Sequence, residues 1–176
     1  MSKTVTSKRL MPKRLMLEKF IPKKELTTTS TELTLTLPFE KRQKSRFRAQ
    51  LTNGLEVGVM IERGQVLRGG DGLQSTDGQI VLIQSADEEV STVHCDNAFD
   101  LARAAYHLGN RHVSLQVGES WLRYLKDHVL DEMVKGFGLT IKYESAPFEP
   151  EIGAYHTGHS HDNHSHSHDD HTHSHH

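Results

Sequence analysis

The chain has few of the features that mark secreted or membrane-bound proteins. Among its 176 residues Cys95 is the only cysteine, so no disulfide can form within the chain. No apolar stretch approaches the ~20 residues that a membrane-spanning helix needs. The basic N-terminal stretch 1–20 is interrupted by charged residues and proline before an apolar segment forms, which is not typical of a signal peptide. We therefore expect a cytoplasmic protein without a membrane partner.

Aromatic residues are also scarce, at 6% of the chain. Lysine and arginine are concentrated in residues 1–48, but no aromatic residues alternate with them in a pattern for stacking on bases. We therefore expect no nucleic-acid partner. Trp121 and Tyr124 are interpreted as packing residues, and Cys95 as a small buried apolar side chain.

Histidine, by contrast, is abundant in one place, the C-terminal segment "HTGHSHDNHSHSHDDHTHSHH". Its ten histidines, out of 14 in the chain, are His156, His159, His161, His164, His166, His168, His171, His173, His175 and His176. An affinity tag would normally be an unbroken run, whereas Ser, Thr, Asp, Asn and Gly separate these histidines. A low-complexity segment without a role is the other alternative to a metal-binding segment.

Repeated His-x-His pairs favour metal binding by this tail. Two such rings point to the same side wherever the chain is extended, and neutral imidazole suits nickel, copper and zinc. Because imidazole has an intrinsic pKa of about 6.5, binding should occur near neutral pH and fail in mild acid. We expect several loosely held ions. Their identity stays open, because the usual affinity order places Cu2+ above Ni2+ and Zn2+.

The first half of the chain alternates apolar and polar residues with period two. Leu33, Leu35 and Leu37 alternate with threonines, and similar runs continue to Gln84. Glycine-rich turns, "TNG", "RGGDG" and "STDG", separate the runs. This pattern predicts an all-β domain of short hairpins over residues 1–86.

The pattern changes after Ala86 to the order β-α-β-β-α-β, which predicts a ferredoxin-like domain over 87–149 and an α+β protein overall. We expect Asp96 to cap the first helix, and Gly109 with Asn110 to end it in a left-handed turn. Residues 1–10 and the tail 150–176 have too little apolar surface to order, so we expect both to be disordered.

Four histidines precede the tail, namely His94, His107, His112 and His128. His112 follows the predicted helix end, so its ring should project from an edge of the domain. Two copies related by a twofold axis could then share one metal ion. His128, in the first turn of the second helix, is the next candidate. The enzymatic alternative is a hydrolytic metal site with Asp127 or Asp131 as general base, but the sequence has no hydrolase motif.

Two strings, "LARAAYHLGNRHVSLQ" at 101–116 and "LRYLKDHVLDEMVKGFG" at 122–138, resemble the urease accessory protein UreE family of nickel metallochaperones. The elements "GNRH" and "DHVLDEM" carry the resemblance. It implies an N-terminal β domain likened to a peptide-binding module, a ferredoxin-like metal-binding domain and often a histidine-rich C-terminus.

The resemblance further implies that His112 and its copy in a homodimer hold one Ni2+, and that His128 contributes to peripheral metal sites. Some members carry a second histidine where this chain has Lys126, which is not a metal ligand at neutral pH. The implied role is delivery of nickel to the urease apoprotein, together with accessory proteins that include the GTPase UreG. The protein would catalyse no reaction. The alternative is a general storage or buffering protein for nickel, zinc or copper.

Overall fold

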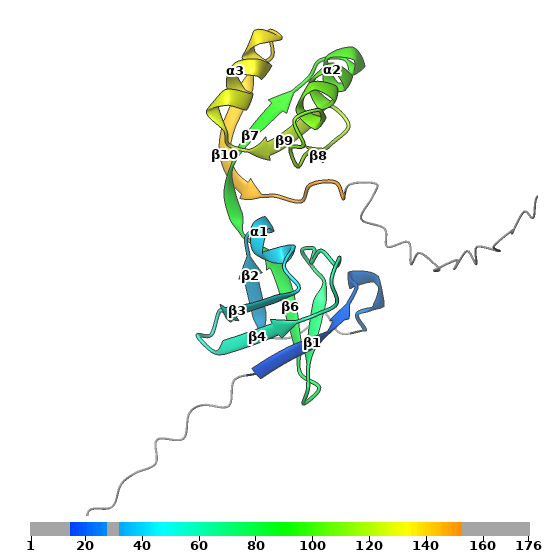
Figure 1. The fold of residues 1–176 in the computed structure, drawn as a ribbon, viewed down its shortest axis with the longest axis vertical. Helices are drawn as coiled ribbons and strands as arrows, with labels where there is room; N and C mark the ends of the chain where they lie inside the picture. The colour runs from blue at the N-terminus through cyan, green and yellow to red at the C-terminus, as the bar shows by residue number, and fades with distance from the viewer. Residues whose placement is uncertain (1–14, 28–31, 153–176) are drawn as a thin grey trace, which may run out of the picture.

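The computed structural model describes residues 15–27 and 32–152, which build two sheets from successive parts of the chain (Figure 1). The six-stranded sheet uses residues before Ala86, and the four-stranded sheet uses residues after it. In Figure 1 the second sheet lies above the first, with its two helices at the far end. The segments predicted to be disordered lie outside the described residues, except that residues 150–152 are described.

The first sheet has the strand order β2-β6-β5-β1-β4-β3. Its strands are β1 (Leu15–Ile21), β2 (Thr34–Leu37), β3 (Arg46–Gln50), β4 (Glu56–Met60), β5 (Gly72–Ser75) and β6 (Ile80–Ser85). The pairs β1–β4 and β2–β6 are parallel, and the other neighbouring strands are antiparallel. The domain therefore contains long-range pairings that short hairpins alone would not give.

The predicted alternation decides which face of these strands is buried. Leu35 and Leu37 are buried while Thr36 between them is exposed, because successive side chains of a strand point to opposite faces. On β3 the same rule turns Phe47 and Ala49 toward the core. The outer face of β3 is consequently left to polar side chains.

The N-terminal half is not purely β, contrary to the prediction. It contains the one-turn helix α1 (Phe39–Arg42), which follows Pro38, and the 3-10 helix η1 (Lys23–Glu25). The glycine-rich turns "TNG" and "STDG" do connect adjacent antiparallel strands, but "RGGDG" does not close a hairpin, because β4 and β5 are not neighbours. It instead places the buried Asp71, whose carboxylate accepts hydrogen bonds from the backbone N–H groups of Lys23 and Arg68.

The second sheet has the order β10-β7-β9-β8, and all its neighbouring strands are antiparallel. Its elements are β7 (Asp87–His94), α2 (Ala98–Gly109), β8 (Gln116–Val117), β9 (Trp121–Leu125), α3 (His128–Gly136) and β10 (Ile141–Pro147). Both helices pack on one face, where Leu108 and Val134 join Val93 and Leu122 in a buried cluster. No helix in the described part of the chain is long and apolar enough to cross a membrane.

The ends of α2 differ from the prediction at two points. The N-cap is Asn97 and not Asp96, because the Asn97 side chain accepts the Asp100 N–H at 2.9 Å. After the helix, Asn110 keeps a right-handed backbone, and the left-handed residue is His112, with φ of 56°. The turn that ends the helix therefore lies two residues later than expected.

Candidate metal-binding site

The turn after α2 holds His112 in an unusual backbone conformation. The His112 N–H donates to the Gly109 carbonyl at 2.9 Å, and the Arg111 N–H donates to the Leu108 carbonyl at 3.0 Å. Among the described residues His112 is the only one other than glycine with a positive φ. Histidine is one of the few side chains enriched in this region. Its imidazole is exposed at the end of the helix.

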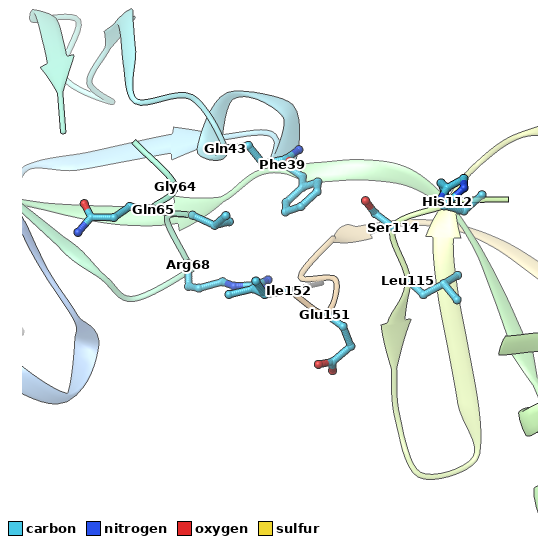
Figure 2. Close-up of a pocket in the computed structure, with 12 residues that line it drawn as sticks. Phe39, Gln43, Gly64, Gln65, Arg68, His112, Ser114, Leu115, Glu151 and Ile152 are labelled. Carbon is cyan, nitrogen blue, oxygen red and sulfur yellow. The ribbon is translucent and has the colours of Figure 1, made fainter. Parts of the chain in front are cut away.

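His112 lines a cavity of about 460 Å3 between the two halves of the molecule. Figure 2 shows His112, Ser114 and Leu115 on one side of it, and Phe39 and Arg68 on the other. The third wall is the segment 151–152, which follows the last strand. The prediction that His112 projects from an edge of its domain therefore needs a refinement, because that edge faces the N-terminal half.

A buried arginine fixes the position of the two halves beside this cavity. Arg42 of α1 is fully buried, and its guanidinium donates to the carbonyls of Leu37, Leu67 and Phe148. It also lies 3.0 Å from the Glu149 carboxylate. Since a buried charge is tolerated only when it is paired and hydrogen-bonded, these contacts explain how an arginine can occupy the junction.

The Glu149 carboxylate collects several further donors. It accepts hydrogen bonds from Ser85 Oγ, from the Gly69 N–H at 2.9 Å and from Arg68 Nη1 at 3.0 Å. Burial by itself would raise the pKa of Glu149, but these hydrogen bonds and the charge of Arg42 outweigh it and hold the pKa below its usual value. Glu149 is therefore ionised at neutral pH and links both halves.

The chain beyond β10 runs alongside the segment that carries His112. The Glu149 N–H donates to Gln116 Oε1 at 3.0 Å, and the Glu151 N–H donates to the Leu115 carbonyl at 2.7 Å. Ile152 ends the described residues and lines the same cavity as His112. The chain therefore leaves the described residues beside the segment that carries His112, and the ten tail histidines lie outside the described residues.

His128 occupies a different place, as the exposed first residue of α3. The helix starts there because the Asp127 carboxylate accepts the N–H groups of Val129 and Leu130. His128 does not line the cavity that His112 lines. Beside it, the Lys126 ammonium lies 3.2 Å from Glu89. Within residues 15–27 and 32–152, no three or more His, Cys, Asp or Glu side chains are grouped closely enough to hold a metal ion.

Asp131, one of the two aspartates considered as a general base, is part of a buried hydrogen-bond network. Its Oδ1 accepts hydrogen bonds from Tyr124 Oη and Ser91 Oγ, both at 2.8 Å, and all three side chains are buried. Burial and the contact with Asp131 raise the pKa of Tyr124, so the phenol stays a donor. This network attaches α3 to strands β7 and β9.

Two further potential metal ligands of the second domain, His107 and Cys95, pack against other side chains of the domain. The His107 ring packs 4.9 Å from the Phe137 ring, centroid to centroid. Cys95 is 5% exposed, which confirms the expected burial. Burial and the nearby carboxylates of Asp100 and Asp96 raise the pKa of the Cys95 thiol, so it is not the thiolate that a metal requires.

Two exposed aromatic residues on α2 were not singled out from the sequence. Phe99 and Tyr106 are 73% and 66% exposed, and their spacing of two helical turns puts them on one face. Ala98 and Ala102 of the same helix are exposed as well. The sequence signal that could have identified this exposed face is the pair of large aromatic residues at positions i and i+7 of the same helix.

Comparison with known proteins identifies the family. The model of the UreE urease accessory protein N-terminal domain matches residues 17–86, and the model of its C-terminal domain matches residues 88–175. The chain belongs to the UreE family. The resemblance based on "GNRH" and "DHVLDEM" is thus confirmed.

Several UreE proteins are similar over most of their length. The urease accessory protein UreE of Alkalilimnicola ehrlichii is 61% identical over 124 residues, which cover 70% of this chain and 76% of that protein. UreE of Saccharophagus degradans is 55% identical over 141 residues, covering 79% and 84% of the two chains. UreE of Teredinibacter turnerae is 52% identical over 139 residues, covering 79% and 88%.

Proposed function

We propose that this UreE protein is a nickel metallochaperone that delivers Ni2+ to the urease apoprotein during assembly of its metal centre. It acts by binding and transfer and catalyses no reaction. The proposed partners are the accessory GTPase UreG and the urease accessory complex. The observation that carries the proposal is an exposed imidazole, His112, in a chain similar to proteins named for urease assembly.

The proposed nickel site forms in a homodimer, where one His112 from each subunit binds the ion. The face of α2 that carries Phe99 and Tyr106 leads along the helix to the His112 turn. Burying such exposed aromatics against a second copy would supply the apolar contact that an interface needs. Two imidazoles leave positions open for ligands of a recipient, unlike a closed structural site with four protein ligands.

The tail is proposed to collect further ions. Its ligands are His156, His159, His161, His164, His166, His168, His171, His173, His175 and His176. Since each residue spans at most ~3.6 Å, the His156 Cα lies within about 14 Å of the Ile152 Cα, which is at the cavity of His112. His128 is proposed as a peripheral ligand, without help from Lys126, whose ammonium is paired with Glu89.

These roles follow a proposed division into three parts. Residues 1–86 form a partner-binding domain, 87–149 a ferredoxin-like metal-binding domain and 150–176 the histidine-rich metal-binding tail. The strand order β10-β7-β9-β8, with two helices on one face, supports the ferredoxin-like assignment. The proposed location is the cytoplasm.

Nickel titration by calorimetry, with the mass in solution measured in parallel, tests the proposal. We delete residues 153–176 and keep Glu151 and Ile152, whose segment is hydrogen-bonded to the body. The truncated protein should retain about one tight Ni2+ per dimer. His112→Ala in this background should abolish that site, whereas His94→Ala, at another exposed histidine, should not.

The general nickel, zinc or copper buffer predicts a different result. There the tail binds all the metal, so the truncated protein would have no tight site and His112→Ala would change nothing. Unchanged nickel affinity and stoichiometry after His112→Ala would therefore contradict the proposed site.

A further inference from the structure

The surface along strands β3 and β4 is hollowed. Three cavities, of about 430, 330 and 260 Å3, lie along these two strands. The largest is lined by Met16, Arg46, Phe47, Arg48, Gly58, Val59 and Met60. This surface belongs to the N-terminal sheet and does not include His112 or the cavity beside it.

The strand register explains the hollow. Gly58 pairs with Arg48 on one side and with Met16 on the other, so these three residues share a row and a face of the sheet. Gly58 has no side chain and is itself buried, so it forms a low point in the row between the methionine and the arginine. Met60, 37% exposed, stands next along the same face of β4, opposite Arg46. Methionines give such a low point an adaptable apolar lining.

The largest of these cavities is flanked by positive charge, whereas the second is lined by both Arg48 and Glu56. Arg46 and Arg48 are exposed and two residues apart on β3, which is one of the two edge strands of the sheet. Neither makes an ion pair within the described residues, and the Arg46 guanidinium donates to the Met60 sulfur at 3.3 Å. Arg63 lines the neighbouring cavity together with Arg46. Arginines on an edge strand commonly prevent self-association, but that role does not require a cavity between them.

We propose that this face binds an acidic segment of a partner protein, with a large apolar side chain of the segment in the hollow and its flanking carboxylates on Arg46 and Arg48. Guanidinium groups bind carboxylates in bidentate geometry, so the contact is specific in its geometry as well as electrostatically favourable. A second copy of this chain is disfavoured, because the same face would oppose arginine to arginine. The inference is independent of nickel binding at His112.

The probe is a synthetic peptide with leucine between pairs of glutamates, Glu-Glu-Leu-Glu-Glu, blocked at both ends. Titrated into the full-length protein and followed by backbone amide NMR, it should shift the signals of β3 and β4. The same peptide with lysine in place of glutamate should not bind. Raising the salt concentration should weaken binding, because exposed charges are screened.

Two variants test separately how much the arginine charges and the cavity contribute to peptide binding. Arg46→Glu/Arg48→Glu should weaken binding at least about tenfold, as reversal of charges at a binding surface does. The control Lys24→Glu/Lys41→Glu makes the same change in net charge at exposed residues outside β3 and should leave binding unchanged. Gly58→Val should fill the hollow and weaken binding while both arginines remain. A thermal melt of each variant checks that it is folded.

Four results would overturn the proposal: no shifts on β3 and β4, equal binding by the double arginine variant, peptide binding that appears only after removal of residues 153–176, or stronger binding of a single-stranded oligonucleotide at the same residues. The third would make the tail the occupant, and the fourth would make the face a phosphate-binding surface.

Discussion

The Arg42 guanidinium and the Glu149 carboxylate lie 3.0 Å apart, although Arg42 belongs to the N-terminal half and Glu149 follows the last strand of the C-terminal sheet. The arginine is fully buried, and the side chain of Glu149 is 26% exposed. Because this pair joins both halves beside the cavity of His112, its strength affects the geometry of the candidate site.

Glu149→Gln should lower the free energy of unfolding. Removing one partner of a fully buried ion pair costs about 3–5 kcal/mol, and partial exposure of Glu149 reduces our expectation to about 2–3 kcal/mol. Urea unfolding at pH 7 measures the change. Glu40→Gln, which removes an exposed ion pair with Lys44, is the control and should have little effect.

The same pair predicts a pH dependence. The pKa of Glu149 is lowered on folding, so its contribution to stability is complete above the ordinary carboxyl pKa of about 4.3 and is lost as the pH falls through the lower folded-state value. The stability difference between the wild-type protein and Glu149→Gln should therefore shrink as the pH is lowered below about 4.5. A difference that stays constant down to pH 3 would show that the charge of Glu149 is not responsible.

The buried network around Asp131 gives a second stability prediction. Tyr124→Phe removes one hydrogen bond and should destabilise the protein by about 1 kcal/mol. Asp131→Ala leaves the hydroxyls of Tyr124 and Ser91 without their acceptor and should cost more, about 2–4 kcal/mol. Tyr143→Phe, at an exposed tyrosine of β10, is the matched control. Equal effects of the two tyrosine variants would contradict the structural role of the network.

Variants of His112 should separate the role of its side chain as a proposed metal ligand from the role of its backbone in the left-handed turn. His112→Asn and His112→Gly suit a positive φ, so both should keep the thermal stability of the protein while losing the proposed tight nickel site. His112→Val should lose the site and in addition about 1–2 kcal/mol of stability, because a β-branched side chain is strained there. Circular dichroism melts and nickel calorimetry together distinguish the two effects. A valine variant as stable as the asparagine variant would argue against the left-handed turn.

The proposed dimer should depend on the outer face of α2. Tyr106→Glu places a charge among exposed aromatics and should shift the protein toward monomers, with Phe99→Glu acting in the same direction. Sedimentation of the metal-free protein measures the state of association. Arg103→Glu changes charge on the same helix, but Arg103 packs on Phe137, so Glu119→Lys, an exposed residue elsewhere, is the better control. Unchanged association of both aromatic variants would place the interface on another surface.

Local patterns predicted much of the second domain. The order of its six elements follows from helical spacing, strand alternation and the turn residues between them, which are all properties of neighbouring residues. Details at the ends of the elements were less predictable. Asp96 and Asn97 are both good caps, and the choice between them depends on the path by which β7 leads into α2.

Features that depend on distant contacts could not be read from the sequence. The stretch "EKRQKSR" around Arg42 resembles a solvated run of charges, yet Arg42 is buried because carbonyls of Leu37, Leu67 and Phe148 converge on it. Strand β1 was missed for a similar reason: it lies within the basic N-terminal region and is held by pairing with β4 and β5. The cavity at His112 likewise needs walls from three separate parts of the chain.

The hydrogen bond from Glu151 to Leu115 has a kinetic consequence for the proposed transfer. It holds the chain at Glu151 beside the segment that carries His112, so the tail imidazoles that we propose as ligands would be tethered to the site, with effective concentrations in the millimolar range for short tethers. Passage of an ion between tail and interface would then be a first-order event within one dimer. Its rate should not change on dilution over the concentrations at which the dimer stays intact.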